Sequence, residues 1–260
     1  MEKKILYKLK DIASDLRAEN GCAWDRKQTF SSLKPYLIEE AYEVYDAIDN
    51  NDPEHLKEEL GDLLYQIYAH SQIASEMNLF DIDDVADGIV SKLIRRHPHV
   101  FGNENITDPE KVKERWEVIK KTEKSERESI LDGIPSHLPA LVKAHRVQEK
   151  VSHVGFDWEK PEDAAAKIDE ELDEFREALA SGIKEKITEE AGDVLFSIVN
   201  VMRLAGIDSE DALRKTIDKF INRFKYLEKQ SEKNGRSIEK MNIAEMEELW
   251  QQAKAALARD

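Results

Sequence analysis

An internal duplication in one fixed register is the feature that most constrains the fold of this chain. The acidic stretch at residues 39–43, Glu-Glu-Ala-Tyr-Glu, recurs as Glu-Glu-Leu-Asp-Glu at 170–174, and the stretch at 58–62, Glu-Glu-Leu-Gly-Asp, recurs as Glu-Glu-Ala-Gly-Asp at 189–193. The register holds without a gap between them, so five glutamates, one glycine and one aspartate repeat with the same spacing. A repeat of this kind predicts two homologous domains in tandem.

Apolar residues accompany the acids at the i, i+4, i+7, i+11 spacing of a helix face. In the first copy they are Leu37, Ala41, Val44 and Ile48, followed by Leu56, Leu60, Leu63 and Ile67. In the second copy they are Ile168, Leu172, Phe175 and Leu179, followed by Ile187, Ala191, Val194 and Ile198. Each copy therefore contains two amphipathic helices, and we predict an all-α fold.

The domain organisation follows from the repeat. We predict a helical-bundle domain at residues 1–125, a short linker at 126–138 around the sequence Leu-Asp-Gly-Ile-Pro, and a homologous domain at 139–260. Predicted helices cover about residues 2–18, 35–48, 53–76, 82–96 and 109–124, then 139–152, 161–180, 184–205, 209–233 and 244–257. Pro35 is placed in the first turn of its helix, which is a favourable position for proline.

Four acidic side chains of each copy are predicted to meet at the rim of this helix pair. At about 100° per residue, Glu40 and Glu43 fall beside the apolar stripe of the first helix. Glu59 and Asp62 straddle one edge of the stripe on the second helix. The two pairs should therefore face each other when the stripes pack together.

A solvated acidic surface is the alternative interpretation, because Asp and Glu make up 55 of the 260 residues. Carboxylates beside an apolar seam, however, repel one another and are poorly hydrated, so four together favour a bound cation. Oxygen ligands without His or Cys suit Mg²⁺ or Mn²⁺ better than zinc.

The charge and cysteine content exclude several classes of protein. The formal net charge is −16, so we expect no direct binding to nucleic acid or to an anionic membrane, which needs a basic face. The charge also repels a free polyphosphate unless a divalent metal is bound. Cys22 is the only cysteine, which excludes an intrachain disulfide and a cysteine zinc cluster. The N-terminus lacks a signal-peptide pattern and no apolar run reaches membrane-spanning length, so we expect a cytoplasmic protein.

One loop and two basic clusters remain open to more than one interpretation. Trp24, in the loop before the first acidic helix, is either a core anchor or part of a base-binding wall, and we favour the anchor because a large aromatic in a loop is usually buried. Lys92, Arg95 and Arg96 at the end of a predicted helix either complement its dipole or hold ligand phosphates. Lys219 and Arg223, at i and i+4, are their counterparts in the second copy.

Motifs for other chemistry are absent from the sequence. There is no Walker A loop, no G-x-G-x-x-G after a strand and no G-x-S-x-G elbow. A di-iron carboxylate bundle needs Glu-x-x-His on its metal helices, and neither acidic helix carries it. Redox chemistry is therefore disfavoured.

The doubled E-E-x-x-E, x(14), E-E-x-G-D pattern resembles the MazG family of nucleoside triphosphate pyrophosphohydrolases. The Trp-Asp loop before it and the sequence Arg-Arg-His-Pro-His-Val-Phe at 95–101 strengthen the resemblance, which covers essentially the whole chain. It implies an all-α, Mg²⁺-dependent homodimer, with Mn²⁺ as a substitute metal. The implied reaction is hydrolysis of an acid anhydride, from NTP or dNTP to NMP and diphosphate, with broad base tolerance and a role in cleaning the nucleotide pool.

The resemblance also assigns roles to residues. The implied metal ligands are Glu171, Glu174, Glu190 and Asp193 in the second copy, with Glu40, Glu43, Glu59 and Asp62 as their first-copy equivalents. The implied nucleotide contacts are Lys167, Glu170, Lys186, Glu189, Lys219, Arg223 and Trp250. Thr188 departs from the family pattern, in which a third acidic residue can precede Glu189.

The expected chemistry follows from these roles. Lys219 and Arg223 are expected to neutralise the pyrophosphate leaving group, and Glu170 or Glu189 to orient the attacking water. The second copy is expected to be the one that turns over NTPs. The alternative is a non-catalytic helical module whose acidic face binds divalent metal or a basic partner, and it does not explain the basic pair.

Overall fold

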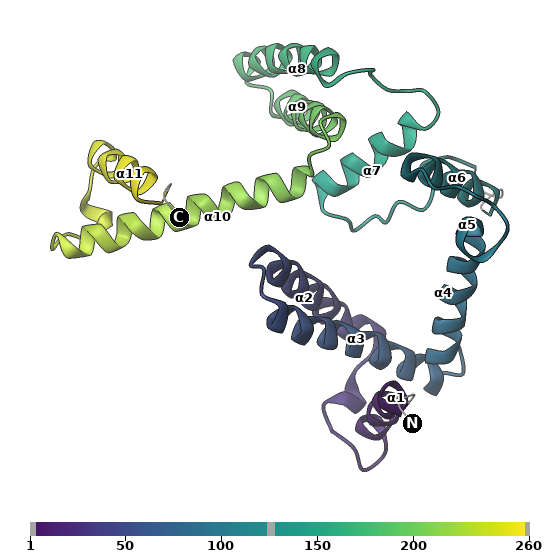
Figure 1. The fold of residues 1–260 in the computed structure, drawn as a ribbon. Coiled ribbons are helices and arrows are strands. Elements are labelled where there is room, and N and C mark those ends of the chain that lie inside the picture. The colour runs from purple at the N-terminus through teal and green to yellow at the C-terminus, as the bar shows by residue number, and fades with distance from the viewer. Residues whose placement is uncertain (1–3, 124–127, 258–260) are drawn as a thin grey trace. The chain divides into compact units, whose positions relative to one another are not determined.

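All regular elements in the described residues, 4–123 and 128–257, are helices in this computed structural model (Figure 1). The predicted all-α fold class is confirmed. None of the described helices is long and apolar enough to cross a membrane.

The chain divides into two compact units, residues 1–125 and 126–260. The first unit contains α1 (Lys4–Arg17), η1 (Asp25–Lys27), α2 (Phe30–Asp49), α3 (Pro53–Glu76), α4 (Ile82–Arg96), α5 (Pro98–Phe101) and α6 (Pro109–Thr122). The second contains α7 (Ala140–Ser152), α8 (Pro161–Ser181), α9 (Lys184–Leu204), α10 (Ser209–Lys233), η2 (Ile238–Lys240) and α11 (Ile243–Leu257). The described part of the predicted linker, residues 128–138, is assigned to the second unit, and Lys150 Nζ on α7 donates to the carbonyls of Ile130 (2.9 Å) and Asp132 (2.8 Å).

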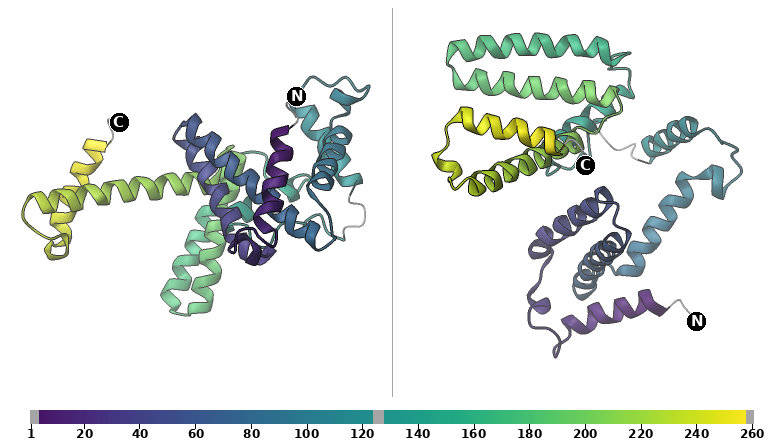
Figure 2. Two further views of the ribbon diagram at one scale, coloured as in Figure 1. Left: turned by 90° about the horizontal axis from the view of Figure 1, so that it is seen from below. Right: turned by 60° about the vertical axis from the view of Figure 1, so that its left-hand side comes forward.

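The helices of the two units pair in the same way (Figures 1 and 2). The acidic helices form a hairpin in each unit, α2 with α3 and α8 with α9, and the preceding helix, α1 or α7, packs on the second member of the hairpin. The next helix, α4 in the first unit and α10 in the second, contacts the second helix of the hairpin. The last long helix of each unit, α6 or α11, packs against α4 or α10 respectively. The tandem repeat predicted from the sequence is therefore a repeat of tertiary structure.

Short polar segments set the start and end of the helices. Asp52 accepts from the backbone N–H groups of Glu54 and His55 and so caps α3. Gly182, at φ 67°, ends α8 in the left-handed conformation that turns the chain into α9. These caps bring the two acidic helices of each copy side by side.

The predicted start of the first acidic helix is wrong by more than one turn. The helix begins at Phe30, where Thr29 and Ser32 form a capping box. Pro35 therefore lies inside α2 rather than in its first turn, where it removes one backbone donor. The capping box was overlooked because its second residue is Ser rather than Glu or Gln.

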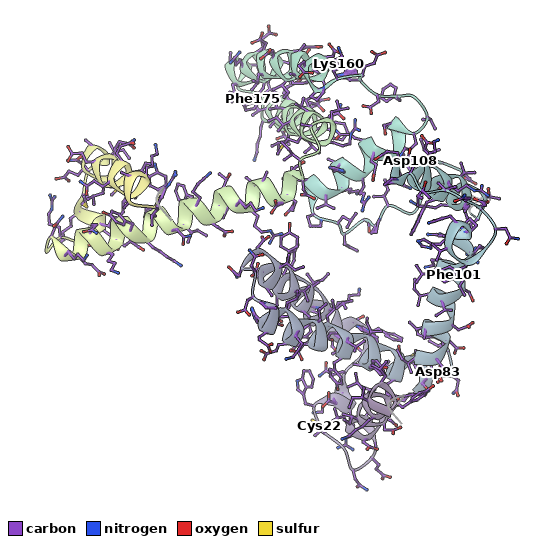
Figure 3. The ribbon with its side chains drawn as sticks, in the orientation of Figure 1. Cys22, Asp83, Phe101, Asp108, Lys160 and Phe175 are labelled. Carbon is purple, nitrogen blue, oxygen red and sulfur yellow. The ribbon has the colours of Figure 1, made fainter. Side chains whose placement is uncertain are left out.

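The cores of the units are small and lie between helices. Leu33, Ala69 and Ile73 form a buried cluster between α2 and α3. A polar contact adds to the packing of the first unit: Lys10 Nζ on α1 lies 2.5 Å from Asp83 Oδ2 at the start of α4, labelled in Figure 3. This contact ties the first helix of the unit to the fourth.

Candidate functional site

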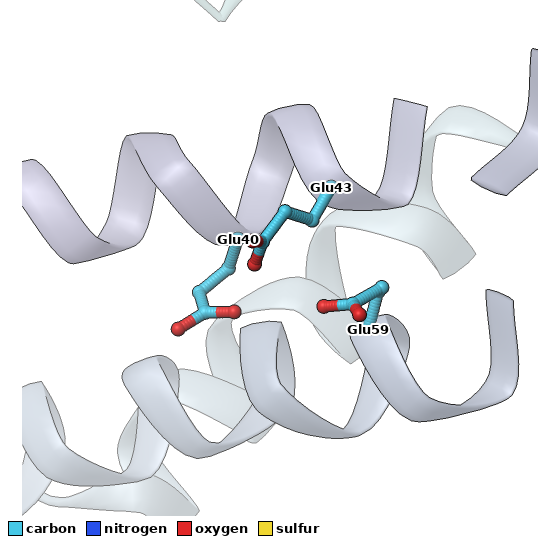
Figure 4. Close-up of side chains that lie close together, drawn as sticks. All are labelled: Glu40, Glu43 and Glu59. Carbon is cyan, nitrogen blue, oxygen red and sulfur yellow. The ribbon is translucent and has the colours of Figure 1, made fainter. Parts of the chain in front are cut away.

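In the first unit, three predicted acidic residues meet between α2 and α3. Carboxylate oxygens of Glu40, Glu43 and Glu59 all lie within 4.8 Å of one another. Figure 4 shows Glu40 and Glu43 from α2 and Glu59 from α3 pointing into the same space. Glu59 is only 8% exposed. This arrangement follows from the helix faces, because both helices present an acid next to their apolar stripe.

In the second unit, the equivalent residues meet in the same way. Carboxylate oxygens of Glu171 and Glu174 on α8 and Glu190 on α9 lie within 4.8 Å of one another, and Glu171 is 6% exposed. The fourth predicted acid of each copy, Asp62 or Asp193, is exposed and outside these groups of three. Each cluster thus has a tight set of three carboxylates with a fourth acid nearby on the second helix.

Burial and mutual repulsion perturb the clustered carboxyl groups. Desolvation, followed by the like charges of Glu174 and Asp193, raises the pKa of Glu190 above its ordinary value. Desolvation likewise raises the pKa of Glu59 and of Glu40. Clustered, poorly hydrated carboxylates with only oxygen donors fit a hard divalent cation such as Mg²⁺ or Mn²⁺.

Lys167 distinguishes the second cluster from the first. Its Nζ lies 2.8 Å from an oxygen of Glu170 and 2.8 Å from an oxygen of Glu171, which raises the pKa of Lys167. The equivalent position in the first copy is Tyr36. There the neighbour of Glu40, the counterpart of Glu171, is a neutral amide, since Gln66 Nε2 donates to Glu40 Oε1 at 3.3 Å. The second cluster therefore carries a permanent positive charge at a place where the first has none.

An open pocket adjoins the second cluster. Its volume is about 560 Å³, and its polar lining includes Lys167, Glu171 and Asp193. Phe156, Trp158 and Phe196 provide aromatic walls. A volume of this size and this mixture of apolar walls with a few polar groups are typical of small-molecule sites. The first copy has a corresponding cavity of about 190 Å³, which Glu40, Tyr36 and Tyr65 help to line.

The expectation that Trp24 is a buried core anchor is wrong. The side chain is 52% exposed, lines the smaller cavity and meets the ring of Tyr36 edge to face, with centroids 5.8 Å apart. Trp24 therefore lines a cavity next to Glu40 instead of filling the core of the unit.

The predicted basic pair lies on α10, where Arg223 faces α11. The Arg223 guanidinium carbon is 5.7 Å from the centroid of Trp250, and Phe220 packs on the same ring at 5.0 Å. Lys219 is exposed on the same helix. Among the described residues of the unit, no hydrogen bond or ion pair joins Lys219 or Arg223 to the acidic cluster. Lys186, Glu170 and Glu189 are exposed on the acidic helices.

The pairing of arginine with tryptophan is a repeated feature that sequence analysis missed. In the first unit the Arg96 guanidinium carbon lies 5.8 Å from the centroid of Trp116, which matches the Arg223–Trp250 pair. The tryptophan follows its arginine at a greater distance along the sequence in the second unit than in the first. This difference in spacing, caused by the greater length of α10, hid the correspondence from a fixed-period comparison.

In the first unit, Glu123 forms ion pairs with two arginines of the basic cluster, Arg95 and Arg96. Glu123 lies 2.5 Å from Arg95 Nε and 2.5 Å from an Arg96 nitrogen, and these hydrogen bonds lower the pKa of Glu123 to about 2. In the second unit, Arg223 Nε is buried without a hydrogen-bond partner among the described residues. The two arginines that stack on tryptophan, Arg96 and Arg223, therefore occupy similar places with different electrostatic partners.

Comparison with known proteins identifies the family. The profile of the MazG nucleotide pyrophosphohydrolase domain matches residues 28–101 and 159–227, which include both acidic clusters. The chain belongs to the MazG family. The resemblance inferred from the doubled acidic motif is confirmed.

Similar MazG-family proteins extend the match to nearly the whole chain. A Thermotoga maritima protein named nucleoside triphosphate pyrophosphohydrolase/pyrophosphatase MazG is 48% identical over 97% of each chain. An Escherichia coli K12 protein named nucleoside triphosphate pyrophosphohydrolase is 42% identical over 91% of each chain. The uncharacterized protein YabN of Bacillus subtilis is 45% identical over 97% of this chain and 53% of its own length.

Proposed function

We propose that this chain is a divalent-metal-dependent nucleoside triphosphate pyrophosphohydrolase that converts NTPs and dNTPs to NMPs and diphosphate, with broad base tolerance. We further propose that it works in the cytoplasm and removes unwanted nucleotides from the pool. The observation that carries the proposal is the opening of a pocket of about 560 Å³ beside the three clustered carboxylates of the second unit. The printed names of the T. maritima and E. coli relatives support the reaction type.

The second unit is proposed as the catalytic one. Glu171, Glu174 and Glu190 would hold Mg²⁺ or Mn²⁺ together with Asp193. When bound, the cation supplies Lewis acidity and offsets the negative charge of the phosphates. The equivalent first-copy residues, Glu40, Glu43, Glu59 and Asp62, would form a second metal site of the same composition.

The remaining polar residues hold and orient the substrate. Lys167 fixes the orientation of Glu171 through its 2.8 Å contact and adds positive charge where the triphosphate approaches. Glu170 and Glu189 are exposed beside the cluster and can orient the attacking water, while Lys186 is exposed on the same helix as Glu189 and can contact the nucleotide. Water attacks a phosphorus at the α–β linkage, the bond from that phosphorus to the bridging oxygen breaks, and the products are NMP and diphosphate.

Lys219 and Arg223 are proposed to neutralise the leaving diphosphate. Because no hydrogen bond or ion pair within the described second unit joins them to the cluster, the proposal includes a homodimer in which α10 of a second copy supplies this pair, with Trp250 behind it. Exposed apolar side chains on α9 and α10 support such an interface, since large apolar patches on a soluble chain mark contact surfaces. They are Leu195, Phe196, Leu213, Ile217, Phe220, Ile221 and Phe224.

Product analysis tests the proposed reaction. The purified protein is incubated with each NTP and dNTP and Mg²⁺, and the products are separated by anion-exchange chromatography. We expect NMP and diphosphate from the wild type and neither from the Glu174→Ala protein. Intact NTPs, or NDP with inorganic phosphate, would contradict the proposal.

A further inference from the structure

A buried glutamine in the pocket of the second unit carries an unused hydrogen-bond acceptor. Gln148 on α7 is 4% exposed and lines the pocket. Its Nε2 donates to the backbone carbonyl of Phe196 on α9 at 2.8 Å. Of the two polar atoms of the glutamine amide, only the nitrogen can donate to a carbonyl, so this contact fixes the orientation of the amide. Gln148 Oε1 is left buried and without a partner among the described residues.

Two other side-chain acceptors of the pocket wall, Asn200 Oδ1 and Asp157 Oδ1, are already engaged. Asn200 Oδ1 accepts from Arg203 Nε and Nη2, at 3.2 and 2.8 Å. Asp157 Oδ1 accepts from the backbone N–H of Trp158 at 2.9 Å and from Arg203. Leaving a buried acceptor unpaired costs free energy, so the Gln148 carbonyl is suited to a donor that arrives with a ligand.

We infer that Gln148 Oε1 accepts a hydrogen bond from the nucleobase of the substrate and is a specificity-determining residue of the second unit. This inference rests on the proposed function. The aromatic side chains of Phe156, Trp158 and Phe196 can enclose the faces of the base, and the Lys167 and Glu171 side chains line the same pocket where the triphosphate approaches the cluster.

One acceptor explains tolerance among the natural bases. Adenine and cytosine carry an amino group on the pairing edge, guanine carries an N–H and an amino group, and uracil and thymine carry an N–H. Each can donate to Gln148 Oε1. Selection therefore acts against a base that has no N–H donor on this edge, not among the natural bases.

The first unit does not repeat this arrangement. The position equivalent to Gln148 is Arg17, which binds Glu76 and the carbonyls of Asp25 and Gln28. The smaller cavity there has its own unpaired acceptor, Gln66 Oε1, on a different helix. Gln66 is therefore the natural comparison for any test of Gln148.

The test measures kcat/KM for ATP and for purine riboside 5′-triphosphate, which lacks the amino group. We expect the wild type to prefer ATP by about tenfold, the worth of roughly one hydrogen bond. In the Gln148→Met protein the ratio should fall to about one. The ratio is taken within each protein, so a loss of folded molecules cancels. CTP and its analogue without the amino group, 2-pyrimidinone riboside triphosphate, should behave in the same way.

The outcomes separate this inference from the proposed function. NTP hydrolysis with no preference for ATP, or with a preference that survives Gln148→Met, overturns the role of Gln148 and leaves the reaction intact. A ratio that is kept in Gln148→Met but lost in Gln66→Met places base recognition in the first unit and also overturns the inference. No hydrolysis of any NTP by the wild type overturns the proposed function and this inference with it.

Discussion

The acidic clusters of the two units share three glutamates at the same spacing but differ in the residue beside them. In the first unit, Glu40 accepts from the neutral amide of Gln66, and Tyr36 stands one turn before it. In the second unit, Glu171 contacts Lys167 at 2.8 Å. The cavities that adjoin the clusters also differ, since the one in the first unit has a volume of about 190 Å³ and the one in the second about 560 Å³. Duplication preserved the carboxylates, while the surrounding charge and space diverged.

The basic regions differ as well. Glu123 pairs with both Arg95 and Arg96 in the first unit, whereas Arg223 in the second unit stacks on Trp250 and has a buried Nε without a hydrogen-bond partner among the described residues. An arginine that is already paired with a carboxylate has fewer free N–H donors and less net positive charge with which to bind a phosphate. The same set of carboxylates therefore lies among different neighbouring charges in the two units.

The largest expected difference between the units is in catalysis. Glu174→Ala should lower kcat/KM for NTP hydrolysis by at least about 100-fold, because the loss of one cluster carboxylate weakens the stabilisation of transition-state charge. Glu43→Ala, the equivalent change in the first unit, should lower it much less. Steady-state hydrolysis of ATP at saturating Mg²⁺ measures both. The reverse ranking would assign catalysis to the first unit.

A smaller effect is expected from exchanging the residues beside the clusters. Lys167→Tyr, which copies the first unit, should lower kcat/KM by roughly tenfold or more, since a hydrogen bond to a charged group contributes about 1.5–3 kcal/mol. The matched exchange Tyr36→Lys should leave hydrolysis close to wild type. An equal loss in both proteins would show that the lysine does not distinguish the units.

The smallest expected effect is on local stability. Glu123→Gln should increase hydrogen exchange in α4 and α6, because Glu123 holds two arginines, and one of them, Arg96, has a side chain that is only 12% exposed. Glu245→Gln in the second unit, where the carboxylate pairs with one arginine, Arg236, and accepts from the backbone N–H of Asn242, should have a weaker effect on α11. Hydrogen exchange followed by mass spectrometry, helix by helix, provides the measurement. A larger effect of Glu245→Gln would contradict the comparison.

The effect of Glu123→Gln should also depend on pH. The pKa of Glu123 falls from an ordinary 4.5 to about 2 on folding. A depressed folded-state pKa stabilises the protein fully above the ordinary pKa, and the stabilisation is lost as the pH falls toward the folded-state value. The difference between variant and wild type should therefore be largest near neutral pH and shrink as the solution is acidified below the ordinary pKa of glutamate. A difference that does not change with pH would show that the ionised carboxylate is not its source.

Much of the fold was predictable because its causes are local. Helical periodicity predicted most helices to within a few residues, and side-chain caps at Asp52, Asp81 and Asp208 begin three of them. Pro35 was misleading because it suggested a helix start where a capping box at Thr29 had already begun the helix. The prediction for Trp24 was also wrong, since its burial depends on how the loop packs on the helices, and the loop leaves this side chain exposed on the wall of a cavity.

The sequence by itself determined the all-α class, the duplication, the family and the helix faces on which the carboxylates lie, because each depends on patterns that can be read along the chain. Tertiary structure alone decided the rest. It placed Glu123 against two arginines, left the acceptors of Gln66 and Gln148 unpaired, and made one cavity much larger than the other. These features depend on how side chains from helices that are distant in sequence pack together and share hydrogen bonds. The spacing of residues along one helix does not contain this information.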